Sequence, residues 1–161
     1  MKKYQNHTLK EYCHCLSLKT PVPGGGSAAA LGGALGAALI SMVANYSLKR
    51  NQSGEVERKI QDILRRSEKI RKRLLELVGL DAAVYLKVVK TRHAPWEEKK
   101  KALQQARKVP LEVCRLCYAA VALTPFLVQK GNPYLQSDVV VAVEFLQAAF
   151  NSAKVNVEIN Q

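Results

Sequence analysis

Two features of the sequence carry residues that can do chemistry: a glycine-rich stretch near the N-terminus and a carboxylate on an apolar helical face. The stretch reads Pro21-Val22-Pro23-Gly24-Gly25-Gly26-Ser27. Its prolines fix an extended approach, its glycines leave backbone N–H groups uncovered, and Ser27 can cap the helix that follows. Unpaired N–H groups and the positive end of the helix dipole favour anions and polar ligands there. For these residues alone, a plain entry turn is the competing interpretation.

The carboxylate is Asp81, which interrupts an otherwise apolar pattern. Between about residues 55 and 91, the residues of this pattern recur at steps of four and three: Val56, Ile60, Ile63, Ser67, Ile70, Leu74, Leu77, Asp81, Val84 and Val88. This spacing predicts a long helix with one face buried against other helices. Burial disfavours the charged form of a carboxyl group, so Asp81 must find partners or have its pKa raised. It is either hydrogen-bonded to a neighbouring helix or an acid/base group facing a pocket.

The remaining patterns are helical as well. We expect helices over residues 8–18, 27–48, 55–91, from 95 onward, and from 137 to the end, with Pro110 breaking or kinking the fourth. Alternating strand patterns are absent. The sequence therefore predicts a single all-α domain over residues 1–161, an up-and-down-like bundle of about five helices. Its Gly/Ala-rich helix is packed centrally. Glycines inside a helix cost about 1 kcal/mol each, so their presence there implies a compensating gain from tight packing or from access to a ligand.

Two asparagines continue the small, apolar face of the last predicted helix. Asn156 and Asn160 follow Ala142, Leu146, Ala149 and Ala153 at the same steps of three and four. Buried amides require hydrogen-bond partners. They therefore mark either helix-to-helix hydrogen bonds or a ligand pocket.

The amino-acid composition limits the classes of binding partner that the protein favours. The 161 residues carry a net charge of +12, from 25 Lys+Arg against 13 Asp+Glu, which favours an anionic partner such as nucleic acid, a membrane surface or a small polyanionic substrate. No aromatic-rich basic face supports nucleic acid as the partner.

Residues 28–44 are apolar but short and rich in Ala and Gly, which favours a buried helix over a membrane span. No signal peptide is recognisable, so we expect a cytoplasmic protein with reduced thiols.

The four cysteines allow one further site. Cys13 and Cys15 form a C-x-C pair and Cys114 and Cys117 a C-x-x-C pair, which together have the ligand types of a four-thiolate zinc site. However, Cys114 and Cys117 lie within an apolar helical pattern, where a free cysteine behaves as a small hydrophobic residue. We therefore expect no metal.

The run PVPGGGSAAALGGALGAALISMVAN, at residues 21–45, resembles the cyclodeaminase / methenyltetrahydrofolate cyclohydrolase family. These are small helical proteins related to the C-terminal domain of formiminotransferase-cyclodeaminase. Further similar motifs follow in order: Asp81-Ala82-Ala83, Val109-Pro110-Leu111, Gly131-Asn132, Ser137-Asp138 and Asn156-Val157-Glu158-Ile159-Asn160. Three features depart from the family pattern. Gly79 replaces the first acid of a D-x-D pair, and Lys49-Arg50-Asn51 replaces a Gly-Lys-Lys segment. The family usually continues with another helix after the last motif, and we expect none here.

The resemblance implies a homodimeric helical fold and one-carbon chemistry on tetrahydrofolate without metal or redox cofactor. It implies Asp81 as the catalytic acid/base. Backbone N–H groups of Gly24, Gly25 and Gly26, with Ser27, would orient polar atoms of the pterin or the one-carbon unit. Asn156 and Asn160 would bind the pterin edge, and Lys49 and Arg50 the glutamate tail. The implied substrate-binding set also includes Asn45, Asn132 and Asp138.

Two reactions fit these residues equally well. One is hydrolysis of 5,10-methenyltetrahydrofolate to 10-formyltetrahydrofolate, and the other is cyclodeamination of 5-formiminotetrahydrofolate with release of ammonia. We expect the hydrolase, because the sequence has no fused formiminotransferase domain. The alternatives from other classes are a catalytically weak folate-binding module and a helical assembly partner.

Overall fold

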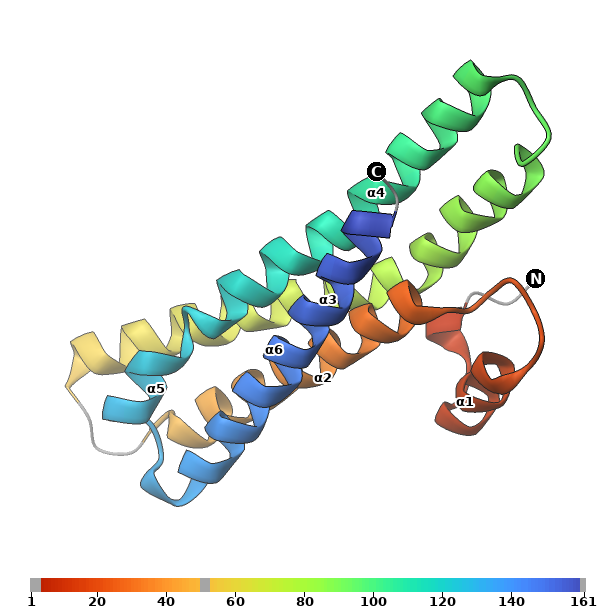
Figure 1. Ribbon diagram of the computed structural model, residues 1–161. Helices are drawn as coiled ribbons and strands as arrows, with labels where there is room; N and C mark the ends of the chain where they lie inside the picture. Colours follow the sequence, from red (N-terminus) through yellow and green to blue (C-terminus); the bar gives the residue numbers. More distant parts are fainter. Residues whose placement is uncertain (1–3, 50–52, 160–161) are drawn as a thin grey trace.

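The computed structural model describes residues 4–49 and 53–159, and in these ranges every regular element is a helix (Figure 1). Five α-helices have nine or more residues within the described ranges, and no strand occurs there. The predicted all-α bundle is confirmed. The elements are a 3-10 turn at Tyr4–Asn6, α1 (Leu9–Ser17), α2 (Gly25–Ser47), α3 (Gly54–Lys90), α4 (Trp96–Val121), α5 (Thr124–Lys130), a 3-10 turn at Pro133–Leu135, and α6 (Gln136–Ile159).

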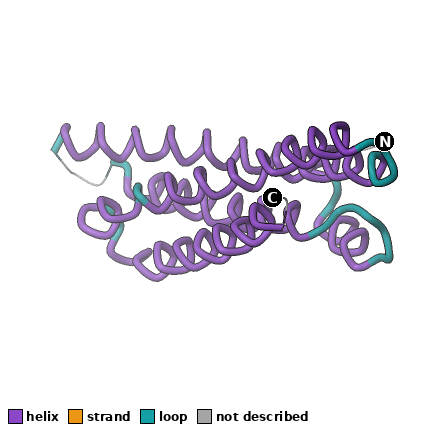
Figure 2. Tube along the Cα trace, turned by 45° about the horizontal axis from the view of Figure 1, so that its top comes forward, coloured by secondary structure: helices purple, strands orange, loops and turns teal. Residues whose placement is uncertain are grey.

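The four long helices alternate in direction along one bundle, and α2 lies between α3 and α6 (Figures 1 and 2). Its glycines allow this close approach. A Cβ atom on Gly36 would come within 2.7 Å of Leu146 Cγ and 2.9 Å of the Ala142 carbonyl oxygen, both on α6. On Gly33 it would come within 3.0 Å of Cys117 Sγ. The predicted central position of the Gly/Ala-rich helix is therefore confirmed, and close packing offsets the cost of its glycines.

The start of α2 differs from the expectation. The helix begins at Gly25 with Gly24 as its N-cap, and no side chain of its own caps it. Ser27 lies in the first turn and is fully buried, so the expected Ser27 cap is wrong. Glycine at the cap position leaves the N–H groups of the first turn to be satisfied by other elements or by ligands.

Proline at position 110 does not end its helix. α4 is continuous from Trp96 to Val121 with Pro110 buried in its interior, so of the two expected outcomes, a break or a kink, the break does not occur. An interior proline costs a helix about 3 kcal/mol, and burial in the core outweighs that cost here. The helical pattern is interrupted later, where α4 ends at Val121 and α5 begins with Pro125 in its first turn.

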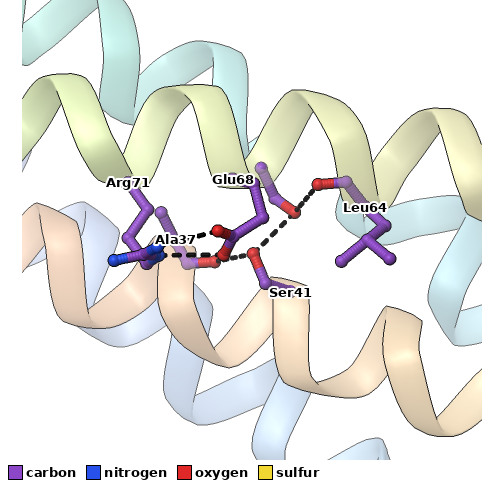
Figure 3. A network of polar contacts seen from close by, with 6 residues as sticks. Ala37, Ser41, Leu64, Glu68 and Arg71 are labelled. Carbon is purple, nitrogen blue, oxygen red and sulfur yellow. Dashed lines mark hydrogen bonds and ion pairs between the residues drawn. The ribbon is translucent and has the colours of Figure 1, made fainter.

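A polar network crosses the contact between α2 and α3 at mid-length (Figure 3). Ser41 of α2 donates to the Ala37 carbonyl (3.1 Å) and lies 2.8 Å from the Ser67 hydroxyl of α3. Glu68 pairs with Arg71 at 2.7 Å and also bonds Ser41. The Arg71 hydrogen bond is the largest cause that lowers the pKa of Glu68, to about 2. This carboxylate therefore stays charged and structural.

Within the described residues, two helical stretches are long and apolar enough to cross a membrane: Gly25–Ser47 and Trp96–Lys130. In the first, 61% of the most apolar 18-residue segment is buried inside the bundle, and in the second 39% of the corresponding segment is buried. The core helix of a soluble protein meets the same criteria of length and composition. The absence of a membrane partner stays a prediction.

Candidate functional site

A cavity of about 270 Å³ opens at the end of the bundle where α2 begins. Segments far apart in the sequence enclose it: the proline-glycine stretch, α3, α4 and the last turns of α6. Its lining combines one carboxyl, one phenol and one amide with backbone and apolar surface: Pro21, Val22, Gly24, Gly25, Gly26, Asp81, Val84, Tyr85, Ala106, Asn156 and Ile159.

The carboxyl group of Asp81 lies directly against the first turn of α2. A Cβ atom on Gly26 would come within 2.9 Å of both Asp81 carboxylate oxygens and would overlap the carboxyl carbon. The Ser27 backbone N–H donates a hydrogen bond to the same carboxyl. Asp81 of α3 therefore takes the place of the side-chain cap that α2 lacks, and only glycine at position 26 leaves room for it.

Burial sets the acidity of this carboxyl. Removal from water raises the pKa of Asp81 to about 6, and the Ser27 N–H lowers it only in part. None of the ion pairs found among the described residues involves Asp81. A carboxyl with a pKa near neutrality can both take and return a proton at physiological pH. Asp81 thus bonds a neighbouring helix and also lines a cavity, and its acid/base role stays a prediction.

The Ser27 hydroxyl is used inside the protein rather than toward the cavity. It lies 3.0 Å from the Val78 carbonyl oxygen of α3 and 3.0 Å from the hydroxyl of Tyr12 in α1. Ser27 is fully buried and does not line the cavity. Its contribution to the site is the backbone N–H that meets Asp81.

Asn156 of α6 lines the cavity, which agrees with one of the two interpretations of its face pattern, and its role in binding a ligand stays a prediction. Its Nδ2 donates to the Ser152 carbonyl at 2.9 Å, one turn earlier in its own helix. Its side chain also lies 3.8 Å from where a Cβ on Gly25 would be. A second groove, between α2 and α6 and more open to solvent, is also lined by these two residues, Gly25 and Asn156. Asn160 lies outside the described residues.

Four other predicted site residues lie at the opposite end of the bundle. Twenty residues of helix separate Gly25 from Asn45, which is about 30 Å at 1.5 Å per residue. Lys49 follows the end of α2, where its backbone N–H meets the Glu57 carboxylate. Asn132 bonds back to this end through the Ser47 hydroxyl, and Asp138 lies in the first turn of α6. The structure does not bring these residues to the cavity. Arg50 lies outside the described residues.

The side chain of Gln5 fills the space beside Gly79, where the family pattern has an acid. A Cβ atom on Gly79 would overlap the Gln5 carboxamide oxygen. That oxygen is buried and has no hydrogen-bond partner among the residues that the structure describes. The glycine thus lets the N-terminal segment approach α3 two residues before Asp81.

Sequence patterns missed several residues of this region. Val84 and Tyr85 follow Asp81 in α3, and the continuing apolar pattern could have indicated Val84. Tyr85, Ala106 and Tyr12 gave no signal, because their approach depends on how three separate helices pack.

No group of three or more His, Cys, Asp or Glu side chains gathers within the described residues. Cys114 and Cys117 are buried in the core, whereas Cys13 is exposed on α1. The four cysteines therefore do not assemble the alternative thiolate site.

A family model described as formiminotransferase-cyclodeaminase matches residues 8–161. The chain belongs to this family. Methenyltetrahydrofolate cyclohydrolase of Methylorubrum extorquens is 36% identical, over 96% of this chain and 79% of that protein. Formimidoyltransferase-cyclodeaminase of Mus musculus is 29% identical over 95% of this chain, which spans only 30% of that protein's length.

A solved structure agrees with this membership. The crystal structure of formiminotetrahydrofolate cyclodeaminase from Thermotoga maritima matches with a TM-score of 0.93 at 33% identity, over 97% of this chain and 79% of that one. The predicted family and its helical fold are confirmed. The relatives' names refer to two different reactions, so they leave the choice between them open.

Proposed function

We propose that the protein hydrolyses 5,10-methenyltetrahydrofolate to 10-formyltetrahydrofolate, with Asp81 as acid and base. The observation that carries this proposal is a partly buried carboxyl with a pKa of about 6 beside the first turn of α2, in a cavity. The similarity to the Methylorubrum extorquens cyclohydrolase supports the choice of substrate.

The steps balance with one water and one carboxyl. Asp81 takes a proton from water while the water oxygen bonds to the electrophilic amidinium carbon. The carbon–nitrogen bond to the pterin ring nitrogen then breaks, and Asp81 returns its proton to that nitrogen. The remaining hydroxyl proton is released as the formyl carbonyl forms. Gly25 and Gly26 offer first-turn N–H groups, which have no acceptor within the helix, to polar atoms of the substrate.

Cyclodeamination of 5-formiminotetrahydrofolate is the second candidate, supported by the match to the Thermotoga maritima enzyme. The N10 nitrogen of the substrate would attack the formimino carbon, and its own proton would pass to the imino nitrogen. Protonated Asp81 would give that nitrogen a second proton as the carbon–nitrogen bond breaks, which releases ammonia and leaves the methenyl cation. The same cavity and the same carboxyl would serve this reaction.

Absorbance spectroscopy separates the candidates. Hydrolysis consumes the near-ultraviolet absorbance of methenyltetrahydrofolate, whereas cyclodeamination of 5-formiminotetrahydrofolate creates it and releases ammonia. We expect the protein to accelerate the loss over the buffer rate. Tight folate binding with no acceleration of either reaction would contradict an enzymatic role and favour a binding module.

The glycine turn has its own test. A valine at position 25 would place its branches against Asn156, whose side chain already lies 3.8 Å from the Cβ position. We expect Gly25→Val to weaken binding of 5-formyltetrahydrofolate, measured by calorimetry. Unchanged affinity would reduce the turn to a simple helix entry.

We further propose that the active form is a homodimer that pairs through the exposed side of α2 and α6. The chain carries +12, yet α2 has no charged residue. Leu35, Phe145 and Val155 on this side are 45, 40 and 52% exposed. A large net charge of one sign keeps copies of a protein apart, so pairing is favoured where neither copy presents a cluster of basic residues, and exposed apolar side chains favour burial.

Sedimentation analysis tests this interface. Phe145→Glu should yield a monomer, because the pairing would bury two unpaired carboxylates. The matched control is Leu9→Glu, which places the same charge at a 74% exposed leucine of α1 and should leave the dimer intact. A monomeric wild type, or a dimer that survives Phe145→Glu, would contradict the proposal.

The proposal includes a cytoplasmic location. All four cysteines are free, as in proteins of a reducing compartment.

A further inference from the structure

Tyr12 links the N-terminal helix to the site. It is the buried residue of α1, with 4% of its surface exposed. Its hydroxyl lies 3.0 Å from Ser27 Oγ, fifteen residues along the chain and in the first turn of α2. No residue of this pair lines the cavity, so the contact lies behind the site.

The direction of the hydrogen bonds follows from the donor count. The Ser27 hydroxyl has one proton, and the Val78 carbonyl oxygen at 3.0 Å can only accept. Ser27 therefore donates to Val78 and accepts from Tyr12. The chain of donation runs from Tyr12 through Ser27 to Val78, three residues before Asp81 in the same helix.

Ser27 forms hydrogen bonds through both its side chain and its backbone. Its hydroxyl is fixed by Tyr12 and Val78, and its backbone N–H donates to the Asp81 carboxyl. A shift of Ser27 would change the geometry of that N–H bond. Because hydrogen bonding to the charged form of a carboxyl lowers its pKa, such a shift would also change the acidity of Asp81.

We propose that Tyr12 is a positioning residue that acts on Asp81 through Ser27. It fixes the serine and so fixes the N–H group that orients the carboxylate. This inference rests on the proposed acid/base role of Asp81, but its first consequence is a property of the resting protein.

The surroundings leave few other groups to set this acidity. Of the titratable side chains, Tyr85 of α3 lines the cavity with Asp81, and Cys13 of α1 lies near Tyr12. The turn, α4 and α6 contribute only uncharged residues to the lining. Burial raises the pKa of Tyr12 above its ordinary value of 10, its hydrogen bond to Ser27 lowers the pKa in part, and the nearby Asp81 carboxylate raises it further. Tyr12 therefore remains a protonated donor while Asp81 titrates.

The test is Tyr12→Phe, which removes the hydroxyl and keeps the ring that packs α1. We expect the pKa of Asp81 to rise by about half a unit, because a loosened Ser27 N–H stabilises the carboxylate less. The turnover number should fall about tenfold, a loss about equal to the free energy of one hydrogen bond. KM should stay within about twofold of wild type. Carbon-13 NMR of aspartate-labelled protein measures the pKa, with Asp81→Asn identifying the resonance.

Tyr4→Phe is the matched control. It removes a hydroxyl from the same N-terminal segment, where Tyr4 donates to the Val22 carbonyl at 3.1 Å, and it should leave the Asp81 pKa unchanged. Ser27→Ala breaks the same link at its centre, so adding Tyr12→Phe to it should cost little more. An unchanged Asp81 pKa and unchanged turnover in Tyr12→Phe would overturn the inference.

These outcomes are separable from failure of the proposed function. If Asp81→Asn keeps full turnover, the acid/base role is wrong. The NMR titration of the Tyr12 variant still shows whether Tyr12 controls the acidity of Asp81.

Discussion

Asp81 and Glu68 are two carboxylates of α3 that meet α2 at different places, and their pKa values move in opposite directions. Glu68 has the Arg71 guanidinium at 2.7 Å and the Ser41 hydroxyl, and its pKa falls to about 2. Asp81 has a backbone N–H and, within the described part of the chain, no cationic partner, and burial raises its pKa to about 6.

The difference comes largely from what lies beside each carboxylate. At mid-length, α2 offers a serine and α3 its own arginine one turn later, which together hold a permanent charge (Figure 3). At its first turn, α2 offers only glycine surface and N–H groups. The same helix, α3, thus carries two different carboxylates: Glu68 is suited to stabilising the fold, and Asp81 is suited to proton transfer.

The largest expected effect is on turnover. Asp81→Asn should lower kcat for methenyltetrahydrofolate hydrolysis by about 10²–10⁴-fold, the usual contribution of a general acid/base, with folate binding retained. Glu68→Gln should stay within about twofold of wild type once folding is verified. The absorbance assay measures both, and equal losses in the two variants would remove the distinction between these carboxylates.

A smaller loss is expected from Gly26→Ala. The added methyl group would overlap the Asp81 carboxyl, so the carboxyl must move away from the Ser27 N–H. We expect kcat to fall about tenfold or more, since misplacement of a catalytic group is costly. Gly24→Ala, where nothing lies within 4 Å of the added atom, should cost less. Steady-state kinetics that rank the two variants in the reverse order would contradict this account.

The smallest effect is on stability, and its sign differs between the two residues. The folded state raises the pKa of Asp81 from 3.8 to about 6, so it binds more protons than the unfolded state between these values. Stability due to Asp81 is therefore full below pH 4 and lost as the pH rises through 6. Asp81→Asn should be more stable than wild type at pH 7.5 by about 1–3 kcal/mol, measured by urea denaturation.

Glu68 should behave in the opposite way. Its pKa is lowered from 4.5 to about 2, so its contribution is present above pH 4.5 and lost as the pH falls toward 2. Glu68→Gln should therefore be less stable than wild type at pH 7.5, and the deficit should shrink in acid. Two variants with the same sign at pH 7.5 would contradict the comparison.

Much of the architecture could be predicted from local patterns. Steps of four and three placed Asp81 on the buried face of α3, because helical periodicity is a property of neighbouring residues. The glycines of α2 indicated close packing for the same reason, and Gly33 and Gly36 do lie tightly against α4 and α6.

The site itself was predicted only in part. Sequence motifs carry no distances, so Asn45, Lys49, Asn132 and Asp138 were grouped with Asp81 although a helix length separates them. Sequence reasoning assigned the Ser27 hydroxyl to the site, whereas the structure uses the Ser27 backbone N–H there. The hydroxyl is instead bonded to Tyr12 and Val78, which come from other helices. Such contacts join distant segments and leave no periodic signal.

Asp81 carries the proton in the proposed reaction, and a comparison of two titrations tests this role. The pKa of the Asp81 carboxyl is measured by carbon-13 NMR, and the pH dependence of kcat/KM for methenyltetrahydrofolate is measured on the same protein. We predict that the carboxyl titrates near pH 6 and that kcat/KM rises with deprotonation at the same value. A carboxyl that titrates near 4, or a rate profile that does not follow it, would contradict the account.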